Sequence, residues 1–395
     1  MRIALYDDRH FSAFGAQRVM VSLATQLKSR GWEPTIITGA IGSLSALADE
    51  AGVAVHIVPI PRQLDIYSGE ALRAPFRTKL RLARFALRYS REIHLAVKAL
   101  RSDIVFANAL RPLLYCAVSR IRTRRPVVWF LQGGRSFGLV SVVAVTLPYR
   151  IMMVSQGAAK ALPRPLRPLL LPRAFVNSPG IDVSRFAGRS ADREQTRQRW
   201  GLPREAFLVA GVGSIEHRKG FDVLLRALDL ARDRVPNLHV VIAGSTRGAL
   251  AQAYERELLA LARRRALPVS LLGWVDDTAG LMAAADVFVL SSRQERFGLV
   301  TVEAMASGLP VIVTRADGSE ETIIDGESGL LVEPEDPSAL ADRIVRLATD
   351  STLRANLAAG GRRRAQEHYT LDRFVDRFIA EMERDQRMKR RPRSL

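Results

Sequence analysis

The sequence predicts an α/β protein of two domains, each containing a parallel sheet covered by helices on both faces. Short apolar and β-branched segments recur along the chain, and amphipathic stretches of helix length separate most of them. There are about thirteen such segments, more than the roughly ten that one open sheet usually holds. The length of 395 residues also exceeds that of one ordinary domain of about 150 residues.

The predicted strands fall into two series. Because strands that alternate with helices form parallel sheets with covered faces, each series predicts one doubly wound sheet. The first series comprises residues 2–6, 34–38, 53–58, 103–107, 126–131, 150–154 and 174–177. The second comprises residues 207–212, 238–243, 268–272, 286–290, 310–313 and 329–332. We therefore expect an N-terminal domain over 1–178, a linker near 178–190, a C-terminal domain over 190–370, a helix over 371–386 and a basic tail over 387–395.

Composition predicts a protein of a reducing compartment. The single cysteine, Cys116, excludes an internal disulfide framework. Residues 2–6 run directly into Asp7 and Asp8, so no apolar segment of a secretory signal is visible. The longest uncharged stretch, residues 34–48, is shorter than the ~20 residues needed to span a bilayer. We expect a cytoplasmic location, with peripheral association at the inner face of the cell membrane as a further option.

Positive charge is concentrated in the first half of the chain. The formal net charge is +19, and residues 1–180 contain 26 Lys and Arg against 9 Asp and Glu. No carboxylate side chain occurs from Ile104 to Ile181. A field of this sign predicts an anionic partner for the N-terminal domain.

Residues 77–101 predict a long amphipathic helix in this basic half. One interpretation is a helix that covers its own sheet and exposes a solvated basic side. The other is a docking surface for anionic lipid. Nucleic acid is a less favoured partner, because the chain has no zinc, RRM or KH signature and only 7% aromatic residues. The basic stripe is Arg77, Arg81, Arg84, Arg88 and Arg91; the opposite apolar stripe is Leu82, Phe85, Ala86, Tyr89, Ile93, Ala96, Val97 and Leu100.

The segment 207–220, FLVAGVGSIEHRKG, predicts a strand, a glycine-rich turn and the start of a helix. Glycines such as Gly213 let a backbone approach a ligand, and the N–H groups at a helix N-terminus favour anions. Arg218 and Lys219 add positive charge where a pyrophosphate could bind. A simple strand–turn–helix corner with a solvated basic pair is the alternative.

A second motif, 291–314, places two glutamates after another predicted strand. Glu295 lies in a polar loop, and Glu303 lies about one turn into a helix that begins near Leu299. Carboxylates accept hydrogen bonds from sugar hydroxyls. The N–H groups of the first helical residues, from Gly298 to Val300, suit a phosphate. Taken singly, each glutamate is also compatible with an ordinary solvated position.

Topology joins the two motifs. In the doubly wound strand order 3-2-1-4-5-6, the first and fourth strands are neighbours, and ligands bind where they meet. Strand 207–212 is the first of the second series, and strand 286–290 is the fourth. The two motifs are therefore expected to face one crevice at the carboxyl edge of the sheet.

The segment E-x-F-G-L-V-x-x-E-A-M-A-x-G-x-P-V-I resembles the signature of retaining GT-B glycosyltransferases of family 4, the glycosyl transferases of group 1. Further similar segments, among them GVGSIEHRKGFDVLLRAL and GLLVEPEDP, extend the resemblance over nearly the whole chain. The resemblance implies two Rossmann-like doubly wound domains that face a central cleft. The N-terminal domain would hold the acceptor, the C-terminal domain would bind a nucleotide-diphosphate sugar, and the helix over 371–386 would pack back on the first domain.

The resemblance also implies residue roles. Glu303 would hold the ribose hydroxyls, Glu295 the transferred sugar, and Lys219 with Arg218 the diphosphate leaving group. No cofactor beyond the donor substrate is implied and no metal, and the chain has no D-x-D motif. The implied activity is transfer of a sugar to a saccharide or lipid-linked acceptor in surface polysaccharide or glycolipid biosynthesis. The remaining implied donor-binding residues are Gly213, Ser214, Phe297, Gly298, Leu299 and Val300, and the acceptor-side residues are Gly15 and Gln132.

Three positions depart from the family pattern. Ser214 stands where the family usually has an arginine, and Gln17 ends the segment FGAQ where the family often has Gly-Gly-Ala-Glu. Gln132 stands where many members have a histidine. Glutamine forms hydrogen bonds but does not titrate. The second hypothesis is therefore a catalytically weak or inactive sugar-nucleotide-binding scaffold of the same fold.

Overall fold

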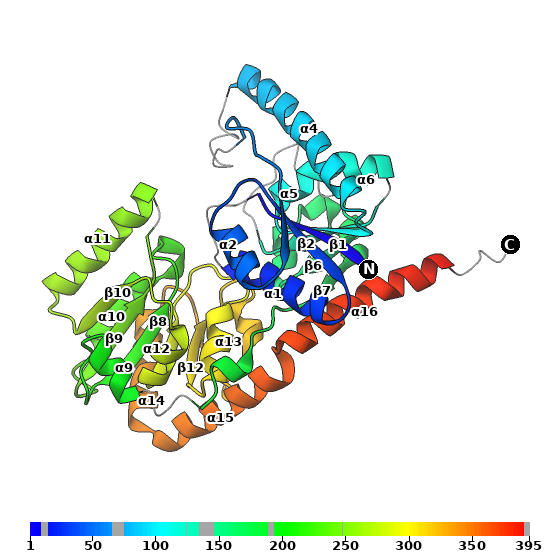
Figure 1. Ribbon diagram of the computed structural model, residues 1–395. Coiled ribbons are helices and arrows are strands. Elements are labelled where there is room, and N and C mark those ends of the chain that lie inside the picture. Colours follow the sequence, from blue (N-terminus) through cyan, green and yellow to red (C-terminus); the bar gives the residue numbers. More distant parts are fainter. Residues whose placement is uncertain are drawn as a thin grey trace. The chain divides into compact units, whose positions relative to one another are not determined.

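The computed structural model describes residues 1–8, 15–64, 75–123, 125–133, 146–188, 193–246 and 248–390. The chain divides into two compact units, of which the first is Met1–Pro179 with Leu371–Leu395 and the second is Gly180–Thr370. Each unit contains one parallel sheet with helices on its faces (Figure 1). The predicted pair of doubly wound α/β sheets is confirmed, and every predicted strand is present within one residue at each end.

The sheet of the first unit has the order β3-β2-β1-β4-β5-β6-β7, and all of its strand pairs are parallel. Each residue of β4 and β5 is buried, because both faces of these central strands are covered. Its strands are β1 (Arg2–Tyr6), β2 (Glu33–Thr38), β3 (Ala54–Ile57), β4 (Ile104–Ala107), β5 (Val127–Leu131), β6 (Arg150–Met153) and β7 (Ala174–Val176). Its helices are α1 (Gly15–Ser29), α2 (Ser43–Glu50), α4 (Phe76–Ala99), α5 (Leu110–Tyr115), α6 (Ala117–Thr123), α8 (Arg167–Leu170) and α16 (Leu371–Arg390).

The C-terminal helix α16 packs against the first unit. The ring of Phe378 lies 6.3 Å from that of Trp32 and 6.0 Å from that of Phe106. Arg150 forms an ion pair with Glu381 at 2.5 Å. The helix ends at Arg390, four residues beyond the predicted end at 386, so the first part of the expected basic tail is helical.

The sheet of the second unit has the order β10-β9-β8-β11-β12-β13, which is the doubly wound order 3-2-1-4-5-6. Its strands are β8 (Phe207–Val212), β9 (Leu238–Ala243), β10 (Val269–Gly273), β11 (Val287–Leu290), β12 (Val311–Thr314) and β13 (Leu330–Val332). Its helices are α9 (Arg193–Arg199), α10 (Phe221–Ala231), α11 (Gly248–Arg264), α12 (Thr278–Ala284), α13 (Leu299–Ala306), α14 (Pro337–Thr349) and α15 (Ser351–His368).

The core of the second unit holds α10 firmly against the sheet. Leu224 and Leu228 of α10 are fully buried with Val240 and Ile242 of β9 and with Ile344 of α14. Burial of each such aliphatic side chain stabilises the fold by about 1.5–3 kcal/mol. The turn between β8 and α10 is therefore held at both ends by elements that are packed into the core.

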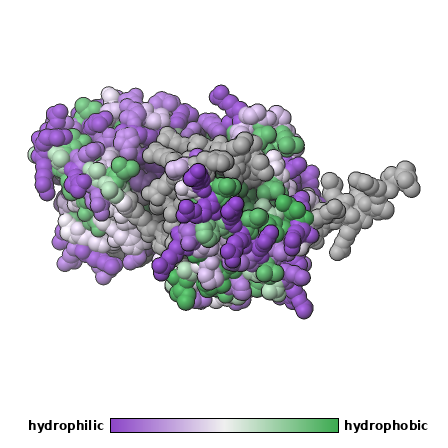
Figure 2. Space-filling view, turned by 90° about the horizontal axis from the view of Figure 1, so that it is seen from above, coloured by the Kyte–Doolittle hydropathy of each residue, from purple (hydrophilic) through white to green (hydrophobic). Residues whose placement is uncertain are grey.

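The surface is mixed in polarity, with small hydrophobic patches among hydrophilic residues on the face shown in Figure 2. Across the described ranges, no helix combines the length and the apolar character that crossing a membrane requires.

Candidate functional site

The turns that follow β8 and β11 meet at the carboxyl edge of the second sheet. Strands β8 and β11 are parallel neighbours, with Val209 opposite Val287. The backbone N–H groups of Arg293 and Gln294 donate to the carbonyl oxygen of Arg218, at 2.8 and 3.3 Å. The structure thus confirms the prediction from strand order that the two turns converge, because segments 213–220 and 291–298 are hydrogen-bonded to each other.

Glycine at position 220 makes this close approach possible. Gly220 has a φ of +65°, and a Cβ atom there would lie 2.0 Å from the carbonyl oxygen of Ser291. A distance of this size excludes any side chain unless the backbone moves. The hydroxyl of Ser291 also donates to the carbonyl oxygen of Lys219 at 3.1 Å.

Lys219 and Glu295 form an ion pair where the two turns meet. Their side chains are only 11% and 14% exposed. Burial by itself raises the pKa of Glu295. The Lys219 ammonium, with Arg218 and the N–H of Arg296, outweighs burial and holds the pKa below its ordinary value. Glu295 is therefore an ionised acceptor, and Lys219 is a cation that is largely screened from water.

Arg218 lies beside Ser214, the position at which the resemblance implies an arginine. Its Nη2 donates to Oγ of Ser214 at 3.2 Å, and its Nε donates to Glu216 at 2.7 Å. The Arg218 side chain is 44% exposed, so it is accessible to an anionic ligand. Gly213 lies at the same turn, where a Cβ atom would approach Cε of Lys219 to 3.1 Å. Position 214 thus lacks a positive side chain, but a neighbouring side chain supplies one.

Helix α13 begins at this edge of the sheet. Gly298 is its N-cap with a φ of +78°, and Leu299 and Val300 form its first turn. The first N–H groups of a helix have no partner within the helix and favour anions. Glu303 lies one turn farther and is partly buried.

The Phe297 side chain is packed away from solvent. It is 5% exposed, and its ring lies 5.6 Å from that of Tyr369 in an edge-to-face arrangement. The Tyr369 hydroxyl donates to the carbonyl oxygen of Glu321 at 3.1 Å. Phe297 therefore anchors the loop, and its backbone rather than its ring is the part suited to a ligand.

Sequence reasoning missed a clamp that joins the two turns. Arg293 donates through Nη1 and Nη2 to the two carboxylate oxygens of Asp222, at 2.7 and 2.8 Å. Its Nη1 also donates to the carbonyl oxygen of His217 at 2.7 Å. The hydroxyl of Tyr254 donates to Asp222 at 2.6 Å, and Glu335 forms an ion pair with Arg293. The clamp ties the loop after β11 to the start of α10.

The charges in the clamp stabilise one another. Burial raises the pKa of Asp222, but hydrogen bonds from Arg293 and Tyr254 and the charge of Arg226 lower it to about 2. Hydrogen bonds to Asp222 raise the pKa of Arg293 above its ordinary value despite burial. The sequence signal that could have drawn attention to Asp222 is its place in the first turn of α10, because acidic residues favour helix N-termini. Its partner lies 71 residues away, which no local pattern reveals.

The two predicted acceptor-side residues lie in the first unit. Gly15 opens α1 and is exposed. Gln132 follows β5, and its Nε2 donates to both the carbonyl oxygen and Oδ1 of Asn108, at 2.9 and 3.0 Å. Nδ2 of Asn108 donates to the buried Asp7 at 2.5 Å, and Gln17 donates to the same oxygen at 2.9 Å. These side chains form a polar network at the carboxyl ends of three neighbouring strands, β1, β4 and β5.

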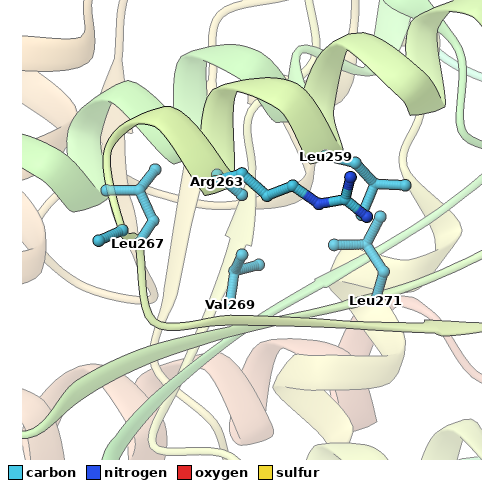
Figure 3. A pocket seen from close by; sticks show the side chains of 7 residues that line it. Leu259, Arg263, Leu267, Val269 and Leu271 are labelled. Carbon is cyan, nitrogen blue, oxygen red and sulfur yellow. The ribbon is translucent and has the colours of Figure 1, made fainter.

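Among the residues that the structure describes, no group of three or more His, Cys, Asp or Glu is arranged to hold a metal ion. A shallow groove of about 380 Å³ lies between α11 and β10 (Figure 3). Its walls include Leu259, Arg263, Leu267, Val269 and Leu271, at the amino end of β10. The groove is therefore separate from the turns at the carboxyl edge of the sheet.

Comparison with known proteins identifies two matching families. Residues 192–364 match the family described as Glycosyl transferases group 1, and residues 14–204 match Glycosyltransferase Family 4. The D-inositol 3-phosphate glycosyltransferase of Salinispora arenicola (strain CNS-205) is 36% identical over 221 residues, 52% of this chain and 48% of that protein. The lipopolysaccharide core biosynthesis glycosyltransferase LpsE of Rhizobium meliloti (strain 1021) is 32% identical over 200 residues, 50% of this chain and 56% of that protein. The chain thus spans about half the length of the curated relatives it matches.

Solved structures confirm the predicted GT-B fold. Anabaena Alr3699/HepE, in complex with UDP and glucose, superposes with a TM-score of 0.82 at 23% identity over 97% of this chain and 99% of that one. WaaG, a glycosyltransferase involved in lipopolysaccharide biosynthesis, gives a TM-score of 0.65 at 20% identity over 95% and 98% of the two chains. At such identities the likeness concerns the fold alone.

Proposed function

This chain belongs to the group 1, family 4 glycosyltransferases of GT-B fold, and we propose that it transfers a sugar from a nucleotide-diphosphate sugar to a saccharide or lipid-linked acceptor, with retention of configuration. The observation that carries the proposal is the Lys219–Glu295 pair at the junction of two strand-end turns, beside the N-terminus of α13. The similarity to LpsE, a lipopolysaccharide core biosynthesis glycosyltransferase, supports glycolipid or surface polysaccharide assembly as the setting.

The donor would bind across the two turns. Lys219 and Arg218 would neutralise the diphosphate, together with the backbone at Gly213 and Ser214. The backbone from Phe297 to Val300 would contact the phosphate or the sugar. Glu303 would accept hydrogen bonds from the ribose hydroxyls. UDP-glucose is the first donor to test, because HepE was crystallised with it.

Donor binding would redistribute the Lys219–Glu295 pair. In the structure each side chain compensates the charge of the other. A bound diphosphate would take over the Lys219 ammonium, which leaves Glu295 able to accept hydrogen bonds from hydroxyls of the transferred sugar. In the absence of donor, the ion pair would therefore hold the Lys219 and Glu295 side chains at the positions where they contact the donor.

The proposed transfer step needs only the donor and the acceptor as reactants. The bond between the anomeric carbon and the diphosphate oxygen breaks, and a bond from the acceptor oxygen forms on the same face of the sugar. The acceptor proton passes to an oxygen of the leaving phosphate. Lys219, Arg218 and the N–H groups of α13 would stabilise the charge that develops on the leaving group, and we propose that no metal shares this task.

The acceptor would approach the first unit near Gly15 and Gln132. The amide of Gln132 is bound to Asn108 and has no titrating group, so it would position a hydroxyl rather than remove its proton. This property favours a mechanism in which the leaving phosphate is the base.

Donor hydrolysis by the purified protein tests the proposal. We expect slow release of nucleoside diphosphate from UDP-glucose or another sugar nucleotide, and we expect Glu303→Ala to reduce it at least about 10-fold, because a charged hydrogen-bond acceptor is lost. Glu257→Ala, which changes an exposed glutamate of α11, is the matched control. Equal hydrolysis by wild type and Glu303→Ala would contradict the assignment of Glu303.

The second candidate is a sugar-nucleotide-binding scaffold without turnover. It is favoured by Glu216, which pairs with Arg218 and compensates part of its positive charge, and by the non-titrating Gln132. A donor that binds but is neither hydrolysed nor transferred in the presence of membrane extracts would support the scaffold.

We also propose that an anionic membrane surface presents the acceptor. The five arginines of the basic stripe on α4, Arg77, Arg81, Arg84, Arg88 and Arg91, are all exposed. Each basic residue near an anionic bilayer contributes about 1 kcal/mol.

A further inference from the structure

The two halves of α4 differ in how they are held. In the C-terminal half, Tyr89, Ile93 and Val97 are fully buried. The Tyr89 hydroxyl donates to the carbonyl oxygen of Val58 at 2.9 Å, and Ser90 donates to that of Tyr115 at 2.7 Å. In the N-terminal half, no residue from 77 to 88 is buried. Figure 1 shows this half extending beyond α6, so the helix is anchored at one end and presents the other.

The arginines of the basic stripe on α4 are not neutralised by carboxylates of the described structure. None of the five guanidinium groups of the basic stripe forms an ion pair with any described residue. Glu92 is the one carboxylate in the helix sequence, against seven Lys and Arg residues. A set of exposed, unpaired cations on one face suits an anionic surface.

The solvent-facing side of α4 also contains leucines that the sequence pattern did not reveal. Leu80 is 49% exposed, Leu87 is 52% exposed and Leu95 is 62% exposed. Spacings of four, three, four, four and three residues place them on one line of the helix with three cations. Along that line leucine and cation alternate: Leu80, Arg84, Leu87, Arg91, Leu95 and Lys98.

We propose that this line of α4 is a membrane-docking face, in which the leucines enter the boundary between headgroups and acyl chains while the cations bind lipid phosphates. An interfacial helix has this combination of apolar and basic side chains. Arginine and lysine stems lie along apolar surface while their charged ends remain in the headgroup layer. Nucleic acid or an acidic polysaccharide would satisfy the cations, but neither offers an apolar environment for three leucines. The inference rests on the proposed anionic membrane partner and adds insertion to it.

Vesicle sedimentation separates insertion from simple charge attraction. We expect binding to vesicles of phosphatidylglycerol and phosphatidylcholine. The triple variant Leu80→Ser, Leu87→Ser, Leu95→Ser should bind at least about 10-fold more weakly, because partly buried apolar area is lost. The variant Arg84→Glu, Arg91→Glu, Lys98→Glu, which reverses the three cations of this line, should bind at least about 100-fold more weakly, since each cation contributes about fivefold.

Matched controls lie in the second unit. Leu230→Ser changes a leucine of α10 that is 52% exposed. The variant Arg256→Glu, Arg263→Glu, Arg264→Glu changes three exposed arginines of α11 by the same total charge. Both controls should bind anionic vesicles as the wild type does. Weakening by the α11 variant equal to that of the α4 variant would show a general charge effect and overturn the assignment to α4.

Insertion depth has a direct reporter. An environment-sensitive dye on Leu87→Cys should shift to shorter wavelength on anionic vesicles, and the same dye on Leu230→Cys should not. The native Cys116 is fully buried and does not compete for the label. An unshifted dye at position 87, leucine variants that bind like wild type, or tighter binding to nucleic acid than to vesicles would each overturn the proposal.

Failure of the docking-face proposal can be told apart from failure of the proposed enzyme function. The leucine variants leave the donor turns unchanged, so their thermal stabilisation by UDP-glucose should equal that of the wild type, which also confirms that they fold. Vesicle binding that depends on the leucines, without any donor hydrolysis, would sustain the docking face and reject the transferase.

Discussion

The clamp between Arg293 and Asp222 predicts a large and specific loss of stability when Arg293 is replaced by methionine. Both side chains are 13% exposed and share two hydrogen bonds. Removing one partner of a buried ion pair costs about 3–5 kcal/mol. Asp222 would retain Tyr254 and Arg226, so we expect the lower end, about 3 kcal/mol for Arg293→Met.

The companion substitution Asp222→Asn should cost about 2 kcal/mol at neutral pH. This figure follows from a pKa lowered from 3.8 to about 2, at about 1.4 kcal/mol per unit. The double variant should be clearly less destabilised than the sum of the two single variants, because neither charge is then left alone. Arg226→Met is the matched control. Its side chain is 54% exposed, so we expect a loss below about 1 kcal/mol.

Hydrogen exchange of the α10 amides measures these effects within the second unit, without requiring both units to unfold together. The reasoning would be refuted if Arg293→Met lowered the opening free energy by less than about 1 kcal/mol, because ordinary surface substitutions already change stability by about 0.5 kcal/mol. It would also be refuted if the effects of Arg293→Met and Asp222→Asn were fully additive.

Three further predictions follow from the geometry. The pKa of Asp222 is lower in the folded than in the unfolded chain, so its contribution is complete above about pH 4 and is lost as the pH falls toward about 2; the acid limb of a Tm–pH profile should flatten in Asp222→Asn. Gly220→Ala should lower the free energy of unfolding by more than about 2 kcal/mol and weaken donor binding, because the new Cβ would lie 2.0 Å from the Ser291 carbonyl oxygen. The control Gly248→Ala is also at positive φ but in open space, so it should cost only about 1 kcal/mol. Equal losses of stability for the two variants in thermal denaturation would contradict this explanation. Burial raises the pKa of Cys116 to about 12, so a thiol reagent at pH 8 should modify it only after denaturation; rapid modification of the native protein would show that the thiol is accessible.

Periodicity and strand order predicted most of the fold. Each strand is a short apolar run, and the helices between them follow a 3.6-residue pattern, so local sequence was sufficient to place thirteen strands. The meeting of Lys219 with Glu295 was predictable because neighbouring parallel strands end at the same edge of a sheet. Gly220 and Gly298 marked the two turns, and both adopt positive φ.

Contacts between distant side chains were not predictable. Arg293 is one arginine in a polar loop, and only the fold brings it to Asp222. Asp7 and Asn108 were likewise visible only as the residues that follow β1 and β4, yet they orient Gln132. On α4 the pattern assigned apolar residues to one face, whereas Leu80 and Leu87 lie among the arginines. That position becomes evident once the buried face of the helix is known.

Donor binding by variants of the two turns tests the central claim most directly. A thermal-shift and calorimetric screen of UDP-, GDP-, ADP- and dTDP-glucose would compare the wild type with Lys219→Ala, Glu303→Ala and the exposed control Arg256→Ala. We predict that at least one donor stabilises the wild type and the control equally, while both turn variants bind it at least about 10-fold more weakly. Binding by both turn variants with wild-type affinity, or binding of none of the four donors by the wild type, would contradict a donor site at the junction of β8 and β11.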